Sequence, residues 1–306
     1  MQRTLIILGL ASLAACQHSS PATQVAIPTH QQLAKSPLVL PAASVPSLFN
    51  VGDTLTKANR AVLQRYNLSQ LWQGYSQRQQ NSILEGVFGP DHYRFELTFQ
   101  QVERDPQRPD YYQVRGKCHY RKNVRPFTGW LIVRELLPLE PPYEEDDGSL
   151  GLGIRPDSIS PDSFMAREQR IFSKINYYAL RAEVRLVEQP APNSGELRGE
   201  ALLNFYVTPN GRLGFAPAPM RPTDGIWREG ALLVRGSRRN VTTHQLKSFV
   251  VADNVYVAAA DVYQDFGLGD RSYETEINPK YSHLGWNEKW ENDEWGADSP
   301  TPSLNL

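Results

Sequence analysis

The chain has 306 residues, with 32 Lys and Arg against 33 Asp and Glu, so its net charge is −1. This balance gives no electrostatic basis for binding nucleic acid, whose phosphates require a basic surface. The sequence holds only two cysteines, Cys16 and Cys118, which excludes a disulfide-rich scaffold. Its length and its 40% hydrophobic residues are sufficient for a sizeable core.

Residues 1–15 have the pattern of a secretory signal peptide. Arg3 is followed by an apolar run from Leu5 to Ala15 that ends in small side chains. The run is too short for a transmembrane helix, which needs about 20 apolar residues. We therefore expect this segment to be removed on export.

The end of the signal, Leu13-Ala14-Ala15-Cys16, resembles the lipobox of bacterial lipoproteins. The resemblance implies cleavage before Cys16 and acylation of its thiol, which would anchor the protein in a membrane. Two acyl chains are enough for stable anchoring. Gln17 follows the cysteine, and similarity to enterobacterial sorting rules then favours the outer membrane. The alternative is an ordinary secretion signal that leaves Cys16 as a free thiol.

Residues 16–48, which begin with the predicted lipidated cysteine, form a proline-rich tether. Prolines fix φ and remove backbone donors, so we expect an extended segment rather than a packed element. About 30 residues at roughly 3.1 Å each would span some 90 Å. The tether would hold a globular domain, residues 49–306, away from the membrane.

The first element expected in this domain is a short helix over residues 53–67, with Asp53 as its cap. Most of the remaining chain alternates between apolar and polar side chains, as in residues 94–100 and 180–186, which is the pattern of strands with one buried face. We predict further strands over residues 82–88, 110–121, 127–137, 199–207, 212–215, 229–235, 248–252 and 254–263.

Short turns between these strands indicate an antiparallel sheet. Residues Thr208–Gly211, for example, would join two strands as a hairpin. Many antiparallel strands with few helices predict a mainly β fold, either a β-barrel or a β-sandwich with one short N-terminal helix.

The sequence contains a weak internal similarity. Tyr111-Tyr-Gln-Val-Arg-Gly116 is similar to Tyr177-Tyr-Ala-Leu-Arg-Ala182, and each is followed by a strand that glycine introduces. The domain could therefore contain two related halves, about residues 70–140 and 176–265, or the similarity could arise by chance. The segments Leu84-Glu-Gly-Val-Phe-Gly89, Tyr112-Gln-Val-Arg-Gly-Lys117 and Pro126-Phe-Thr-Gly-Trp130 also resemble uncharacterised secreted lipoproteins of the Bacteroidetes type. The resemblance covers about residues 70–140 and implies no activity.

Three of the six tryptophans lie close together near the C-terminus, among acidic residues. Aromatic rings beside carboxylates suit the binding of a sugar, and paired carboxylates could hydrolyse a glycosidic bond. Alternatively, the segment covers the core with its tryptophans and leaves its acids in water. The candidate ligand-binding residues are Trp286, Trp290, Trp295, Glu288, Glu291 and Asp293.

The sequence contains no recognisable catalytic, metal or nucleotide motif, so we expect no cofactor. Cys118 and His119 are neighbours on a predicted strand and should point to opposite faces, which disfavours a catalytic dyad. We predict a lipid-anchored lipoprotein of the cell envelope that is a non-catalytic binding or assembly module for a glycan or an envelope protein. The alternatives are a glycan hydrolase that uses the C-terminal carboxylates and a purely structural lipoprotein.

Overall fold

The computed structural model describes residues 54–74, 83–139, 170, 173–223, 226–260, 262, 279–286 and 293–296. All of these residues belong to the second of the two units into which the chain divides, Pro46–Leu306. The predicted signal peptide, Cys16 and the tether therefore lie outside the described residues.

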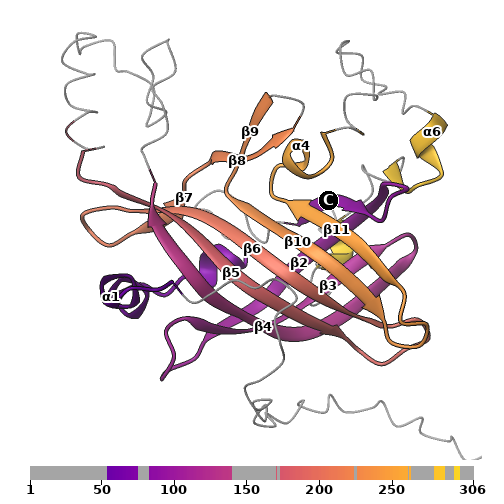
Figure 1. Cartoon of the computed structure of the whole chain (residues 1–306), viewed down its shortest axis with the longest axis horizontal. Helices are drawn as coiled ribbons and strands as arrows, with labels where there is room; N and C mark the ends of the chain where they lie inside the picture. The colour runs from indigo at the N-terminus through magenta and orange to yellow at the C-terminus, as the bar shows by residue number, and fades with distance from the viewer. Residues whose placement is uncertain are drawn as a thin grey trace, which may run out of the picture. The chain divides into compact units, whose positions relative to one another are not determined.

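Strands dominate the described residues (Figure 1). The helical elements are α1 (Lys57–Arg65), α2 (Ser69–Trp72), α4 (Val255–Ala258), α6 (Pro279–Ser282) and the 3-10 helix η2 (Asp293–Gly296). The strands are β1 (Leu84–Phe88), β2 (Tyr93–Arg104), β3 (Tyr111–Tyr120), β4 (Asn123–Pro138), β5 (Asn176–Glu188), β6 (Gly195–Val207), β7 (Leu213–Phe215), β8 (Ala218–Thr223), β9 (Ile226–Gly230), β10 (Leu232–Asn240) and β11 (Leu246–Ala252).

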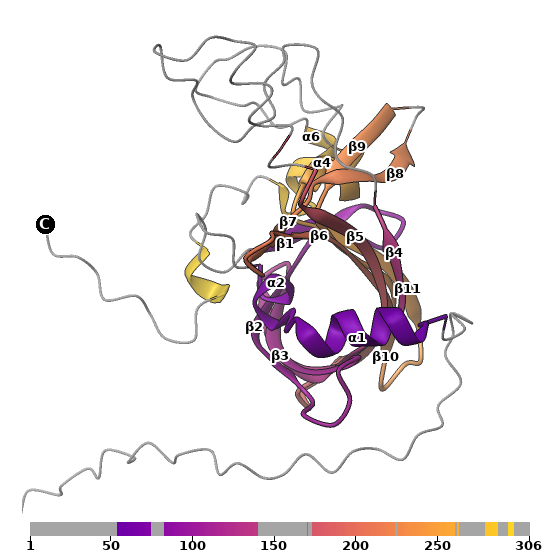
Figure 2. The same ribbon diagram turned by 90° about the vertical axis from the view of Figure 1, so that its left-hand side faces the viewer.

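The main sheet closes on itself as an antiparallel barrel. Its strand order is β10-β11-β1-β2-β3-β4-β5-β6-β7, and β10 also pairs with β6. This second pairing completes the ring that Figure 2 shows end on. Two strands pair with β6 beyond β5: β10 pairs with Gly195–Leu203 and β7 pairs with Phe205–Val207. The mainly β prediction is thereby confirmed, and of its two architectures the strand pairing selects the barrel.

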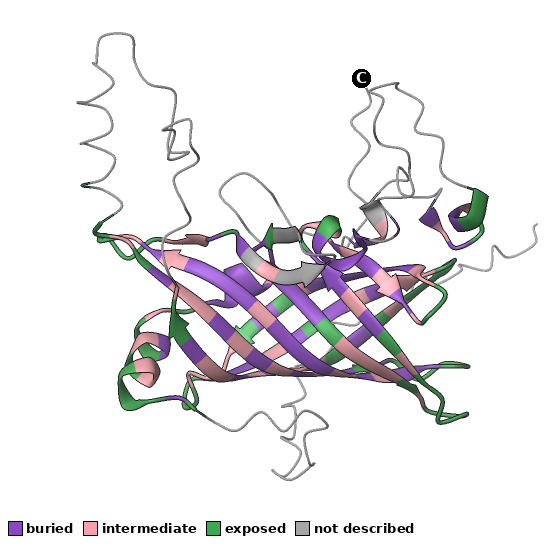
Figure 3. Cartoon of the chain, turned by 45° about the horizontal axis from the view of Figure 1, so that its top comes forward, coloured by how far each residue is buried: buried purple, intermediate pink, exposed green. Residues whose placement is uncertain are grey.

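Alternating burial along strands such as β3 and β5 follows the sequence pattern (Figure 3). Phe95, Leu97 and Phe99 of β2 point into the barrel and join its core. On β5, Leu180, Ala182, Val184 and Leu186 do the same, whereas the intervening charged side chains lie on the outer face. The interior is filled by large side chains, as expected for a narrow barrel of eight strands.

Glycines and bulges allow the sheet to curve. A Cβ atom added at Gly116 of β3 would overlap the carbonyl oxygen of Thr98 on β2, so only glycine permits the strands to approach so closely. Register shifts occur at Phe99/Gln101 in β2 and at Val133/Glu135 in β4. Such bulges bend a strand and increase its twist, which helps the sheet to close.

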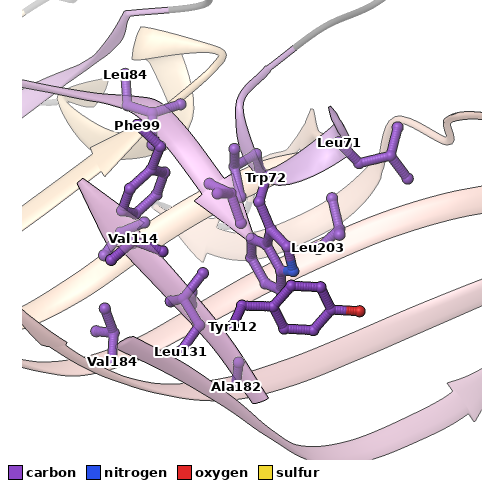
Figure 4. Close-up of a cluster of buried hydrophobic side chains, with 14 of the residues drawn as sticks. Leu71, Trp72, Leu84, Phe99, Tyr112, Val114, Leu131, Ala182, Val184 and Leu203 are labelled. Carbon is purple, nitrogen blue, oxygen red and sulfur yellow. The ribbon is translucent and has the colours of Figure 1, made fainter. Parts of the chain in front are cut away.

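The N-terminal helices cover one end of the barrel (Figure 2). Helix α1 begins at Lys57, later than the predicted start, because the Thr56 side chain caps it by accepting from the backbone N–H of Asn59. Helix α2 was not predicted, and it inserts Leu71 and Trp72 into the core. Figure 4 shows Trp72 beside Tyr112 within this cluster, with ring centroids 6.4 Å apart.

Two predicted strand starts were too late. Strand β4 begins at Asn123 rather than 127, and β6 begins at Gly195 rather than 199. Proline lacks an N–H donor and is unfavourable inside a sheet, so Pro126 indicates a later start for β4 than the structure has. Pro126 nevertheless pairs with Lys117 within the sheet. The predicted halves share one barrel sheet, to which residues 70–140 contribute β1–β4 and residues 176–265 contribute β5–β7, β10 and β11, whereas β8 and β9 form a separate two-stranded sheet. None of the described helices is both long and apolar enough to cross a membrane.

Candidate functional site

A pocket with a volume of about 610 Å³ lies on the outer side of the barrel. It is bounded by the turn between β1 and β2, by the outer faces of β10 and β11, and by α4 with the residues that follow it. We call it the outer groove. Because large side chains fill the barrel interior, this external groove is the candidate ligand site.

The polar wall of the outer groove comes from neighbouring strands. Strand alternation places Arg235 and Ser237 on the outer face of β10, and Ser237 lies opposite Ser248 in the β10–β11 register. Arg235 donates from Nε to Oε1 of Glu200, at 2.6 Å. Glu200 is buried, whereas 47% of the Arg235 side chain is exposed. The wall thus offers two hydroxyl groups and a fixed guanidinium group.

The remaining lining of the outer groove is a mainly aliphatic wall, and α4 with the residues that follow it contributes Ala258, Ala259 and Val262. The sequence analysis predicted a strand over residues 254–263, which is wrong for Val255–Ala258. The Asn254 side chain accepts from the backbone N–H of Tyr256 and starts a helix there, and the alanines that follow favour a helix. The residues of this wall are Val87, Val250, Ala258, Ala259 and Val262.

Close approach of α4 to β1 depends on Gly86. A Cβ atom added at Gly86 would lie 2.8 Å from Cβ of Ala258 and would overlap the carbonyl oxygen of Val250. A larger residue at this position would therefore push α4 off the barrel and open the aliphatic wall.

Trp286 supports the outer groove from behind rather than lining it. The side chain is fully buried, and its Nε1 donates to the backbone oxygen of His92, at 2.8 Å. It packs in one cluster with Ala259 and Val262, which are groove residues. Trp286 therefore has no exposed ring face on which a sugar could stack.

Trp295 packs elsewhere on the barrel. Its ring centroid lies 5.2 Å from that of His119 on β3, and its backbone oxygen accepts from Nζ of Lys117. The structure thus places Trp286 at the β1–β2 turn and Trp295 on β3, each in contact with the barrel. For these two residues the arrangement matches the alternative of a C-terminal segment that covers the barrel.

The remaining residues of the predicted aromatic and acidic surface are not placed. Trp290, Glu288 and Glu291 lie outside the described residues, and Asp293 belongs to η2 without a described side chain. The hydrolase alternative depends on the separation of these carboxylates, so nothing in the described geometry favours it.

A charged network lies beneath the C-terminal segment on the outer face of β1–β3. Glu96 is buried and accepts from Nη2 of Arg94, and its other oxygen lies 2.7 Å from Nδ1 of His119. Arg94 also donates from Nε to Glu85. Because the backbone N–H of Arg94 donates to the oxygen of Leu284, this network helps to fix the C-terminal segment on the barrel.

Cys118 does not complete a catalytic dyad with His119. Its side chain belongs to the barrel core, whereas His119 lies on the outer face with Glu96. Burial raises the pKa of the Cys118 thiol, and the nearby Glu188 carboxylate raises it further, so the thiol stays protonated. The predicted opposition of the two side chains is therefore confirmed.

Sequence reasoning missed the outer groove. Glu200, Arg235, Ser237 and Ser248 have the ordinary pattern of an exposed strand face, and no local motif marks them. Only the long-range pairing of β10 with both β6 and β11 brings them together. Among the described residues, no cluster of His, Cys, Asp and Glu could hold a metal ion.

Comparisons with known proteins give no further indication of function: no family model, no curated protein and no solved structure matches the chain.

Proposed function

We propose that this protein is a lipid-anchored binding module of the cell envelope that holds its ligand in the outer groove. Anchoring at Cys16, export by residues 1–15 and residence in the outer membrane are part of this proposal. The observation that carries it is a groove of about 610 Å³ that combines an aliphatic wall with hydroxyl groups and a fixed Arg–Glu pair. Ligand sites commonly join an apolar surface with a few oriented polar groups.

The lining favours a polyhydroxylated ligand, such as a sugar unit of an envelope glycan. The exposed part of the Arg235 guanidinium can donate to a ligand oxygen, and Ser237 and Ser248 can donate or accept. The aliphatic wall can take the C–H face of a sugar ring. Among the described lining residues Glu200 is the only carboxylate, and Arg235 engages it. This supports binding rather than glycoside hydrolysis.

Filling the outer groove tests its role. The double substitution Ser237→Leu and Ser248→Leu adds bulk at two facing positions without removing the Arg235–Glu200 pair. Calorimetry and array binding with a panel of envelope glycans should show at least a tenfold loss of affinity. The matched control is Thr128→Leu, an exposed position on β4 away from the groove. Equal binding by the groove variant and the control would overturn the groove proposal.

The membrane anchor has its own test. In cells given a labelled fatty acid, the wild-type chain should carry the label and sediment with membranes. Cys16→Ala should remove the label and release the chain into the soluble fraction, whereas Cys118→Ala should retain the label. If Cys16→Ala remained labelled, the lipidation proposal would be wrong, whatever the result for the groove.

A further inference from the structure

Four short turns gather at one end of the barrel, the right-hand end in Figure 1. They join β1 to β2, β3 to β4, β5 to β6, and β10 to β11. In a barrel of antiparallel neighbours these turns must lie at the same end, opposite the end that α1 and α2 cover. We call it the turn end.

The turn end carries an excess of basic side chains. Within the described residues its acidic side chains are Asp91, Glu188 and Glu196, and Glu196 pairs with Arg185 and Arg198. Glu188 is buried and accepts two hydrogen bonds from Arg238, at 2.6 and 2.7 Å, so it contributes little negative charge to the surface. Arg238 is neutralised by the same pair, and the basic residues that remain at the turn end are Arg121, Lys122, Arg125, Arg239 and Lys247.

Aromatic side chains hold some of these cations in place. The guanidinium carbon of Arg121 lies 4.2 Å from the ring centroid of Tyr93 and 5.3 Å from that of Tyr120. Nζ of Lys247 lies 5.9 Å from the ring centroid of Phe88. The charge at this end is therefore partly fixed in position, which lowers the entropy lost when an anionic partner binds.

Exposed aliphatic side chains accompany the basic ones. Val241 and Leu246 are each 58% exposed and flank the β10–β11 turn, and Val124 is 42% exposed beside Arg125. Leu246 is opposite Arg239 in the β10–β11 register. A surface that combines cations with protruding aliphatic side chains suits a lipid interface, where headgroups carry the charge and the acyl boundary accepts apolar groups.

We propose that the turn end docks on a membrane surface rich in anionic lipid headgroups. The charge of the turn end is complementary to the phosphate groups, and Val124, Val241 and Leu246 reach the acyl boundary. Nucleic acid would satisfy the cations and leave these aliphatic side chains unburied. The inference deepens the proposed membrane anchoring, since a tether of about 90 Å would allow this end to face the membrane.

Vesicle sedimentation tests this docking. The full chain with Cys16→Ala removes the anchor, so that binding reports the barrel surface alone. It should sediment with vesicles of phosphatidylcholine mixed with phosphatidylglycerol and only weakly with phosphatidylcholine alone. Binding should weaken when ionic strength rises from about 0.01 M to about 0.15 M, because the screening length falls from roughly 30 Å to roughly 8 Å.

Charge reversal locates the docking surface. Lys122→Glu with Arg239→Glu, both exposed at the turn end, should lower the partition onto anionic vesicles at least fivefold. The matched control, Lys57→Glu with Arg212→Glu, makes the same change in net charge at exposed positions of the opposite end and should bind as the parent chain does. Val241→Ser with Leu246→Ser should lower the binding that persists at higher salt.

The results of these experiments distinguish docking by the turn end from a simple phosphate site and from ligand binding in the outer groove. Equal partition onto neutral and anionic vesicles, or equal loss by both charge-reversed variants, would overturn docking by the turn end. Displacement by inorganic phosphate at constant ionic strength would indicate a phosphate site rather than a lipid surface and would also overturn it. The groove variant Ser237→Leu with Ser248→Leu should bind vesicles as the parent chain does, so failure of the groove proposal leaves this one intact.

Discussion

The two ends of the barrel are closed by different chemistry. At the helical end, α2 inserts Trp72 among the core side chains, and Arg104 donates from Nη1 to the carbonyl oxygens of Leu63, Gln64 and Tyr66 at the end of α1. At the turn end, a buried carboxylate, Glu188, accepts from Arg238 and from the backbone N–H of Gly195. One end is therefore a continuation of the apolar core, and the other is an ion pair beneath hairpin turns.

We expect the helical end to contribute more to the stability of the fold and the turn end to contribute more to binding a partner. Apolar burial at the helical end stabilises the fold in proportion to the area removed from water. The ion pair at the turn end adds less net stability because both charges lose their hydration. The exposed cations of that end, which are not part of this pair, remain where an anionic partner can reach them. Substitutions at the two ends should therefore have unequal effects on the free energy of unfolding.

The largest effect should follow from removing the tryptophan at the helical end. Trp72→Ala deletes a fully buried ring and should lower the free energy of unfolding by about 3–5 kcal/mol, measured by urea denaturation. Trp130→Ala is the matched control, because Trp130 is only half-buried on the outer face of β4. A loss for Trp72→Ala no greater than for the control would contradict the view that α2 is part of the core.

A somewhat smaller loss is expected at the turn end. Glu188→Ala leaves Arg238 without its buried partner and should cost about 3 kcal/mol. Glu135→Ala breaks a surface pair with Arg181 and should cost less than about 1 kcal/mol. The double variant Glu188→Leu with Arg238→Met should recover much of the loss, since it removes both charges. If it were no more stable than Glu188→Ala, the ion pair would be a main source of stability at this end.

The smallest effect concerns pH. Burial raises the pKa of Glu196, but hydrogen bonds from Arg198 and Arg185 outweigh it and hold the pKa below its usual value of 4.5. A lowered pKa contributes stability that is complete above pH 4.5 and is lost as the pH falls through the folded-state value. Glu196→Gln should therefore show a weaker decline in melting temperature between about pH 5 and pH 3 than the wild type. Identical declines would indicate that these arginine contacts do not persist in solution.

Regular alternation made the fold class predictable. Phe95, Leu97 and Phe99 point inward as their spacing indicates, and the same holds from Leu180 to Leu186 on β5. The sequence could not choose between a barrel and a sandwich, because both bury one face of each strand. The choice depends on the pairing of β6 with β10 and of β11 with β1, which join residues far apart in the chain.

Local patterns were least reliable where short helices meet the barrel. Val255–Ala258 has the apolar composition of a strand, yet the Asn254 cap and its packing against β1 and β11 make it a helix. Trp286 illustrates the same limit for the site, since a tryptophan among acidic residues suggests a ligand surface and tertiary packing buries it.

By itself, the sequence determined which side chains point into the barrel on regularly alternating strands such as β5, because a period of two in hydrophobicity requires one inward and one outward face. It also contains Leu13-Ala14-Ala15-Cys16, and the prediction of a lipobox there depends on local residue identity alone. Only the tertiary structure decided where the outer groove and the basic turn end are formed. Both are built from residues of distant strands, whose meeting depends on how the ring closes rather than on any local property of the chain.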